Sequence, residues 1–333
     1  MIYKAPLRLS IAGGGTDVDP FATEHGSAVI NFAINTEITF EIKYIPDTRK
    51  KSIEFVFHKQ KESLGSDLEF SKQLSEVFER KFAPFLKKSL LISINNPVNS
   101  GSGLGASSTI VAGSIFAIAN ELKLGLRADQ VTNLAHEIER KEMKRPGGFQ
   151  DYYPAVFGGI NFLERLGGSQ EVKVTRVAAS HILRDFINRS LFCFSLGQQR
   201  KGEDVISDQI KRSKDKSSNT YFALKLQLDL VKKIRKSVAQ NDFKSLLDLV
   251  DESYSLKKKF SPLITNPVIE EMERRLRSIG GKGIKVSGAG GGGHMFSFFE
   301  HGVPKDVQKI LLPQMQILPV SLQELGARKL AHE

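Results

Sequence analysis

A glycine-rich segment at residues 97–109, Pro-Val-Asn-Ser-Gly-Ser-Gly-Leu-Gly-Ala-Ser-Ser-Thr, constrains the fold of this chain more than any other feature. An apolar run suited to a strand, 90–94, precedes it, and a helical pattern of apolar residues from Ile110 to Leu122 follows it. A glycine loop that opens a helix directs free backbone N–H groups and the positive end of the helix dipole at one point. The segment therefore predicts an anion site, and a phosphate is the usual occupant.

Several kinds of loop compete for this segment. The spacing of Gly101, Gly103 and Ala106 fits the dinucleotide fingerprint, but that fingerprint needs the strand to run straight into the first glycine, and residues 95–100 intervene. The Walker loop needs a lysine near its end, and Gly105 is followed by alanine instead. A third pattern is a proline followed by Gly-Leu-Gly-x-Ser-Ser, and a plain structural turn is the fourth possibility. The third pattern is matched by Pro97, Gly103, Leu104, Gly105, Ser107 and Ser108.

Two further glycine-rich stretches bear on that choice. Residues 12–17, Ala-Gly-Gly-Gly-Thr-Asp, follow a strand-like run, and Asp17 can serve there as a turn carboxylate or as an acceptor for sugar hydroxyls. Residues 283–296 carry five glycines between Ser287 and His294 and run from strand to strand, so a Rossmann interpretation fails here as well. Their bare backbone could close over the loop at 97–109.

Single charged residues are ambiguous when they are taken alone. Arg8 lies on a mostly apolar strand and must face solvent or meet a carboxylate. Glu139 borders the apolar stripe of a helix predicted over 127–142, and periodicity alone favours a solvent-exposed charge. Asp151 follows Gly147-Gly148 and reads as an ordinary turn aspartate.

The joint order of these segments resembles the GHMP kinases, the superfamily of galactokinase, homoserine kinase, mevalonate kinase and phosphomevalonate kinase. Its first motif is similar to residues 5–17, its second to 97–109, its Gln-Asp element to 146–152 and its third to 283–296. The resemblance implies a two-domain α+β fold. A ribosomal-protein-like N-terminal domain would span 1–184, and a ferredoxin-like α/β sandwich would span 185–333. The active site would lie between them and transfer the γ-phosphoryl group of ATP to a hydroxyl of a small molecule.

The resemblance also implies roles for individual residues. Asp151 would be the catalytic base, and Arg8 would hold it ionised and oriented. Ser107 and Glu139 would bind magnesium through oxygen. The nucleotide would lie on Gly101, Ser102, Gly103, Leu104, Gly105, Ala106, Ser107 and Ser108. The acceptor would contact Gly14, Gly15, Thr16, Asp17, Gln150, Gly290 and Gly291.

The first motif departs from galactokinases, because Gly14 and Gly15 stand where those carry Glu-His. It resembles instead the branch of heptose 7-phosphate kinases and fucose kinases. That branch implies phosphorylation of the anomeric hydroxyl of D-glycero-α-D-manno-heptose 7-phosphate for nucleotide-heptose synthesis, with L-fucose as the alternative acceptor. A phosphorylated acceptor needs a basic site, for which we favour Arg145 or Arg200. The basic residues near the motifs are Lys4, Arg8, Lys144, Arg145, Arg200 and Lys201.

Two other classes of protein function have to be weighed. The net charge of +11 raises nucleic acid as a partner, but the lysines of 211–216, 232–236 and 257–259 fit solvated helix faces, and we expect no nucleic acid. A catalytically inactive sugar-sensing protein is the other class, against which the complete Ser107, Glu139 and Asp151 set argues. The single Cys193 fits a reducing cytoplasm. No apolar run is long enough to span a membrane, and we expect a monomer or homodimer.

Overall fold

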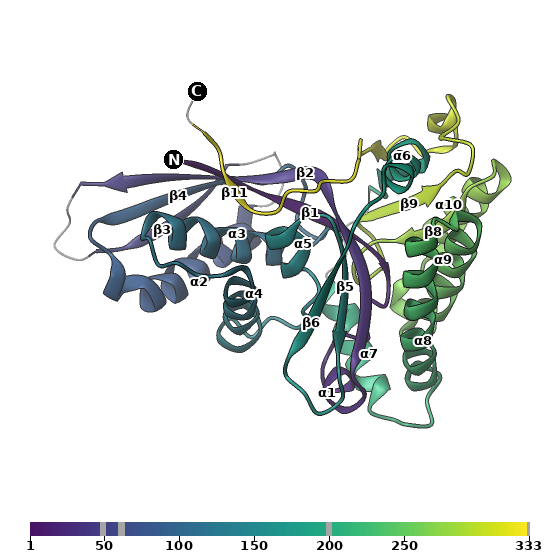
Figure 1. Cartoon of the computed structure of the whole chain (residues 1–333), viewed down its shortest axis with the longest axis horizontal. Coiled ribbons are helices and arrows are strands. Elements are labelled where there is room, and N and C mark those ends of the chain that lie inside the picture. Colours follow the sequence, from purple (N-terminus) through teal and green to yellow (C-terminus); the bar gives the residue numbers. More distant parts are fainter. Residues whose placement is uncertain (47–50, 59–63, 198–201, 332–333) are drawn as a thin grey trace.

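The structure is a computed structural model that describes residues 1–46, 51–58, 64–197 and 202–331 (Figure 1). Within these ranges, strands form two separate sheets, and helices pack on both, which confirms the α+β class. The first sheet has seven strands, in the order β11-β1-β2-β4-β3, with β5 and β6 attached through β2. The second has four, in the order β10-β7-β9-β8.

Long antiparallel strands dominate the first sheet. Its members are β1 (Ile2–Ala12), β2 (Ser27–Ile45), β3 (Ile53–His58), β4 (Ser89–Asn95), β5 (Ile160–Arg165), β6 (Val172–Val177) and β11 (Arg328–Lys329). Strand β2 is long enough to pair with β1, β4 and β5. The second sheet contains β7 (Leu191–Ser195), β8 (Lys282–Val286), β9 (His294–Phe298) and β10 (Gln316–Ile317).

Helices connect and cover the sheets. They are α1 (Phe21–His25), α2 (Leu64–Phe82), α3 (Ala106–Glu121), α4 (Ala128–His136), α5 (Tyr152–Phe157), α6 (His181–Ser190), α7 (Gly202–Ser213), α8 (Asn219–Gln240), α9 (Phe243–Lys258) and α10 (Pro267–Ser278). Helices α2 to α5 lie along one side of the first sheet, and α8 to α10 stand beside the second (Figure 1). Helix α3 is buried along almost its whole length, as expected for a helix whose sequence is apolar on all sides.

The predicted elements around the glycine segments are present. Strand β4 leads into the loop at 97–105 and α3 leaves it, as the apolar runs indicated. The third glycine stretch runs from β8 to β9. Asn266 caps α10, since its side chain accepts the backbone N–H of Ile269 at 3.0 Å. The helix predicted over 127–142 is α4 followed by a wider π-helical turn, Glu137–Glu142.

The C-terminal segment returns to the first sheet. Strand β11 pairs antiparallel with β1, and the guanidinium of Arg328 donates to both carboxylate oxygens of Glu37 at 2.6 and 2.9 Å. Ala327 N–H also donates to the carbonyl of Ala155 at 2.8 Å. Residues 327–329 of the predicted second domain are therefore docked on the first sheet and α5, and the boundary between 184 and 185 stays a prediction.

Candidate active site

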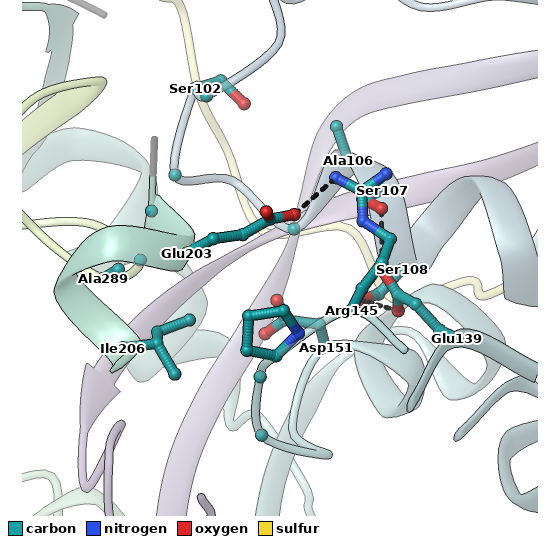
Figure 2. Close-up of a pocket in the computed structure, with 18 of the residues that line it drawn as sticks. Ser102, Ala106, Ser107, Ser108, Glu139, Arg145, Asp151, Glu203, Ile206 and Ala289 are labelled. Carbon is teal, nitrogen blue, oxygen red and sulfur yellow. Dashed lines mark hydrogen bonds and ion pairs between the residues drawn. The ribbon is translucent and has the colours of Figure 1, made fainter. Parts of the chain in front are cut away.

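A cleft of about 820 Å³ brings the glycine segments together (Figure 2). Its wall combines residues from the loop after β1, the loop before α3, the π-helical turn, the segment 143–151, α7, the end of α9 and the loop after β8. The sequence motifs, which lie far apart along the chain, thus line one space.

The loop before α3 has the geometry of an anion site. Gly101, Gly103 and Gly105 have φ values of 76°, 73° and 79°, in the left-handed region that side chains rarely adopt. Gly105 precedes the first residue of α3, and no side chain caps this helix end. Its first N–H groups are therefore available to a bound anion. All the predicted nucleotide residues line the cleft except Leu104, which is buried beneath it.

The loop after β8 is hydrogen-bonded to the loop before α3. Ser287 Oγ donates to the carbonyl of Gly103 at 2.8 Å. The Ser102 carbonyl accepts the backbone N–H of His294 at 3.0 Å and lies 2.9 Å from its Nδ1. The third glycine stretch therefore contacts the second, as the sequence predicted. Gly288 and Ala289 line the cleft, whereas Gly290 and Gly291 lie behind it, where Gly291 N–H donates to Ile264.

Arg8 and Asp151 form a two-pronged ion pair. Nε and Nη2 of Arg8 donate to the two oxygens of Asp151, both at 2.7 Å, and Nη1 donates to the carbonyl of Gly103 at 2.5 Å. Arg8 is almost fully buried, whereas the Asp151 side chain keeps 19% exposure and lines the cleft. The guanidinium fixes the carboxylate in one orientation, against the cleft and next to the anion loop.

Glu139 lies in the π-helical turn, and three hydroxyl groups hold its carboxylate. Ser107 donates to Oε1 at 2.7 Å, while Ser108 and Tyr152 donate to Oε2 at 2.6 and 2.8 Å. Burial alone raises the pKa of Glu139, but the Arg140 cation and these hydroxyls outweigh burial, so the net pKa lies below its usual value. Periodicity alone favoured an exposed Glu139 and was wrong, because the π turn directs this side chain inward, where it is 2% exposed. The resemblance to GHMP kinases had instead implied a metal ligand at this position.

Asp17 is held by amide groups instead. The N–H of Gly15 donates to Oδ1 at 2.9 Å, and the N–H of Gln150 donates to Oδ2 at 3.1 Å. Burial raises the pKa of Asp17, the amide N–H groups oppose this, and the Asp151 charge adds to it. Gly14, Gly15, Asp17 and Gln150 line the cleft, but the Thr16 hydroxyl is buried and donates to the carbonyl of Gly13 at 2.7 Å.

Arg145 lies across the cleft from α7. Its guanidinium pairs with Glu203 at 3.0 Å and lies over the Phe70 ring, and Figure 2 shows Arg145 and Glu203 pointing toward each other. Lys144 also lines the cleft, whereas Lys4 lies on β1 away from it. The predicted cations Arg200 and Lys201 fall outside the described residues.

Two further residues of the cleft were not predicted. Gln209 of α7 donates to the carbonyl of Gly15 at 2.9 Å, which links α7 to the first glycine loop. The interpretation of 257–259 as a solvated helix face was wrong for Lys257, which lines the cleft at 4% exposure. Its position was detectable, because Val250, Tyr254 and Lys257 recur at helical spacing on the buried face of α9.

Two family models match the chain. The model described as GHMP kinases N terminal domain matches residues 69–159, and the one described as GHMP kinases C terminal matches residues 232–314. The sequence is 32% identical to a D-glycero-alpha-D-manno-heptose 7-phosphate kinase of Campylobacter jejuni, over 89% of this chain and 88% of that protein.

Two other similarities have lower sequence identity. A bifunctional fucokinase/GDP-fucose pyrophosphorylase of Arabidopsis thaliana is 24% identical over 92% of this chain, which spans 30% of that longer protein. The fold is similar to a crystal structure described as a D-glycero-D-manno-heptose 1-phosphate kinase from Bacteroides thetaiotaomicron, with a TM-score of 0.75, 24% identity and 99% coverage of both chains. Within the described ranges, no helix has the length and apolar character needed to cross a membrane.

Proposed function

Because the chain belongs to the GHMP kinase family, we propose that it transfers the γ-phosphoryl group of ATP to the anomeric hydroxyl of D-glycero-α-D-manno-heptose 7-phosphate. The family and the phosphotransferase class, which the motifs predicted, are confirmed by the family models and by the heptose kinase relative. The observation that carries the proposal is the Arg8-bound Asp151 facing the cleft beside the uncapped start of α3.

The proposed reaction assigns a task to each group. The acceptor oxygen attacks the γ-phosphorus, its proton passes to the Asp151 carboxylate, and the bond from the γ-phosphorus to the bridging oxygen breaks, so that ADP leaves with the electron pair. Arg8 keeps Asp151 oriented for this transfer. The loop 101–107 and the start of α3 hold the phosphates by backbone N–H groups.

Magnesium fits the oxygens of Ser107 and Glu139. These atoms are 2.7 Å apart, and Glu139 is biased to its charged form. The described residues contain no group of three or more His, Cys, Asp or Glu that could hold a metal. A magnesium ion that takes few protein ligands and completes its shell with phosphate oxygens and water suits such a site. When bound, the ion would neutralise charge on the phosphates.

The acceptor is proposed from the first glycine loop and the nearby cations. Asp17 and Gln150 offer buried hydrogen-bonding groups to sugar hydroxyls beside Asp151. Lys144 and Arg145 offer positive charge to the phosphate that the heptose already carries. L-Fucose is the second candidate, supported by the similarity to the plant fucokinase, but it leaves these cations without a partner on the sugar. We also propose that the reaction takes place in the cytoplasm, to which a single cysteine is suited.

The test is a coupled assay of ATP consumption with four acceptors: heptose 7-phosphate, free heptose, L-fucose and galactose. We expect the fastest turnover with heptose 7-phosphate. Faster turnover of an unphosphorylated sugar would refute the acceptor and keep the kinase. Binding of a sugar with no turnover of any acceptor would favour the inactive sensing protein.

A further inference from the structure

Lys257 is a cation without a counter-charge on the wall of the cleft. It lies near the C-terminal end of α9, and its ammonium donates to the carbonyl of Gly288. No carboxylate of the residues that the structure describes forms an ion pair with it, although the next residue, Lys258, pairs with Glu273. An ammonium has three N–H donors, so the Gly288 carbonyl leaves donors for a ligand.

The position is costly for a lysine. Burial lowers the pKa of Lys257 to about 8, with the Arg8 charge adding to the effect and the Asp17 and Asp151 carboxylates opposing it. A buried cation without an ion partner destabilises the folded chain, whereas Lys259, two residues further on, is exposed to solvent. Such a cost is typical of a group kept for a bound anion.

The contacts of Gly288 locate that anion. A Cβ added at Gly288 would lie 2.7 Å from Gly103 Cα, so the two glycine loops touch where Lys257 is bound. The carbonyl of Gly103 in turn accepts Nη1 of Arg8, which holds Asp151. Lys257 therefore lies at the junction of the phosphate-binding loop and the proposed base.

On the basis of the proposed function, we propose that Lys257 is a catalytic residue that contacts the phosphoryl group during its transfer from ATP to the acceptor. Negative charge spreads over the oxygens of that group in the transition state, and a fixed ammonium stabilises it. Lys257 neither gives nor takes a proton in this step, because the acceptor proton goes to Asp151. The contact through Gly288 to Gly103 favours the transferred group over the phosphate that the heptose already carries.

Lys257→Met tests the proposal, with Lys259→Met as the matched control from the same run of lysines. We expect Lys257→Met to lower kcat by about 10²–10³-fold, as removal of one transition-state donor does, and to leave both KM values within a few-fold. Lys259→Met should leave kcat and both KM values unchanged. The melting temperature of Lys257→Met should stay equal or rise, because a buried charge is removed, whereas a purely structural lysine would lower it.

The pH profile gives a second readout. The wild type should lose kcat/KM for ATP as pH rises through about 8, the pKa of Lys257 in the ligand-free protein. The charged groups that act on Lys257 there are Arg8, Asp17, Asp151 and Lys285. Lys257→Arg should shift that loss to higher pH, because a guanidinium stays charged.

A third readout needs no acceptor. ADP with aluminium fluoride imitates the phosphoryl group, and its gain in affinity over ADP alone should be largest in the wild type and lost in Lys257→Met. Equal gains and an unchanged kcat would overturn the proposal. A rise confined to the KM for heptose 7-phosphate would overturn it in favour of the sugar's own phosphate. If no acceptor is turned over, the proposed function fails, and the aluminium fluoride comparison still decides the role of Lys257.

Discussion

Glu139 and Asp17 line the same cleft at almost equal burial, with exposures of 2% and 3%, and their pKa values move in opposite directions. Glu139 has a neighbouring guanidinium and three hydroxyl donors, so its charged form is favoured. Burial raises the pKa of Asp17 and the charge of Asp151 adds to the rise, while the amide N–H donors oppose it without outweighing it, so the neutral form gains. The difference shows that partners, not depth, set the charge of a buried acid. This difference in charge fits the proposed binding of a metal ion by Glu139 and the proposed binding of sugar hydroxyls by Asp17.

The largest effect should come from Asp151, the third carboxylate of the cleft, because it is the proposed base of the reaction. Asp151→Asn keeps the shape and removes the charge that accepts the proton. We expect kcat to fall by about 10²–10⁴-fold, with ATP affinity measured by calorimetry little changed. Turnover close to that of the wild type would show that Asp151 positions the sugar and does not accept its proton.

A smaller effect should separate the two serines on Glu139. Both serines line the cleft, but only Ser107 is a proposed metal ligand, and Ser108 is buried at 3% exposure. Ser107→Ala should raise the magnesium concentration for half-maximal turnover about 10-fold, the equivalent of one contact of about 1.4 kcal/mol.

Ser108→Ala is the matched control. It should raise the magnesium requirement less than Ser107→Ala does, and lower the free energy of unfolding by about 1–3 kcal/mol, because it removes a hydrogen bond to a charged group. Equal magnesium titrations for the two variants would contradict the assignment of the metal to Ser107.

The pH dependence of unfolding should distinguish Asp17 from Glu139. The folded pKa of Asp17 lies above its usual value of 3.8, so its contribution to stability falls as pH rises from there through the folded pKa. The folded pKa of Glu139 lies below its usual value of 4.5, so its contribution is present above 4.5 and is lost as pH falls through the folded pKa.

Denaturant titrations of the variants at several pH values would check these signs. Relative to wild type, Asp17→Asn should gain free energy of unfolding as pH rises from 3.8 through the folded pKa of Asp17. Glu139→Gln should lose free energy of unfolding relative to wild type as pH rises toward 4.5. Parallel curves for the two variants would show that the two environments do not differ.

Much of the fold and the backbone of the site could be predicted, because local patterns encode them. Strand β4, the loop before α3 and the loop after β8 each carry their own apolar and glycine signals. The pairing of Arg8 with a carboxylate was one of two options, and the resemblance to GHMP kinases selected Asp151.

Contacts between distant segments were harder to predict. Arg145 meets Glu203, and Gln209 meets Gly15, through the placement of α7, which no short-range pattern specifies. Glu139 points inward because a π turn changes the helical register, and a period of 3.6 residues does not foresee this. Lys257 carried a periodic signal that charge composition concealed.

The hydrogen bonds from Ser287 and His294 to the loop at 102–103 have a consequence for chains assembled from two relatives. The groups that hold the loop before α3 come from residues 184 and 192 positions away in the sequence. A recombinant that joined the N-terminal half of one relative to the C-terminal half of another would have to preserve both sides of these contacts. The two glycine loops therefore form one hydrogen-bonded unit, although they lie in separate parts of the sequence.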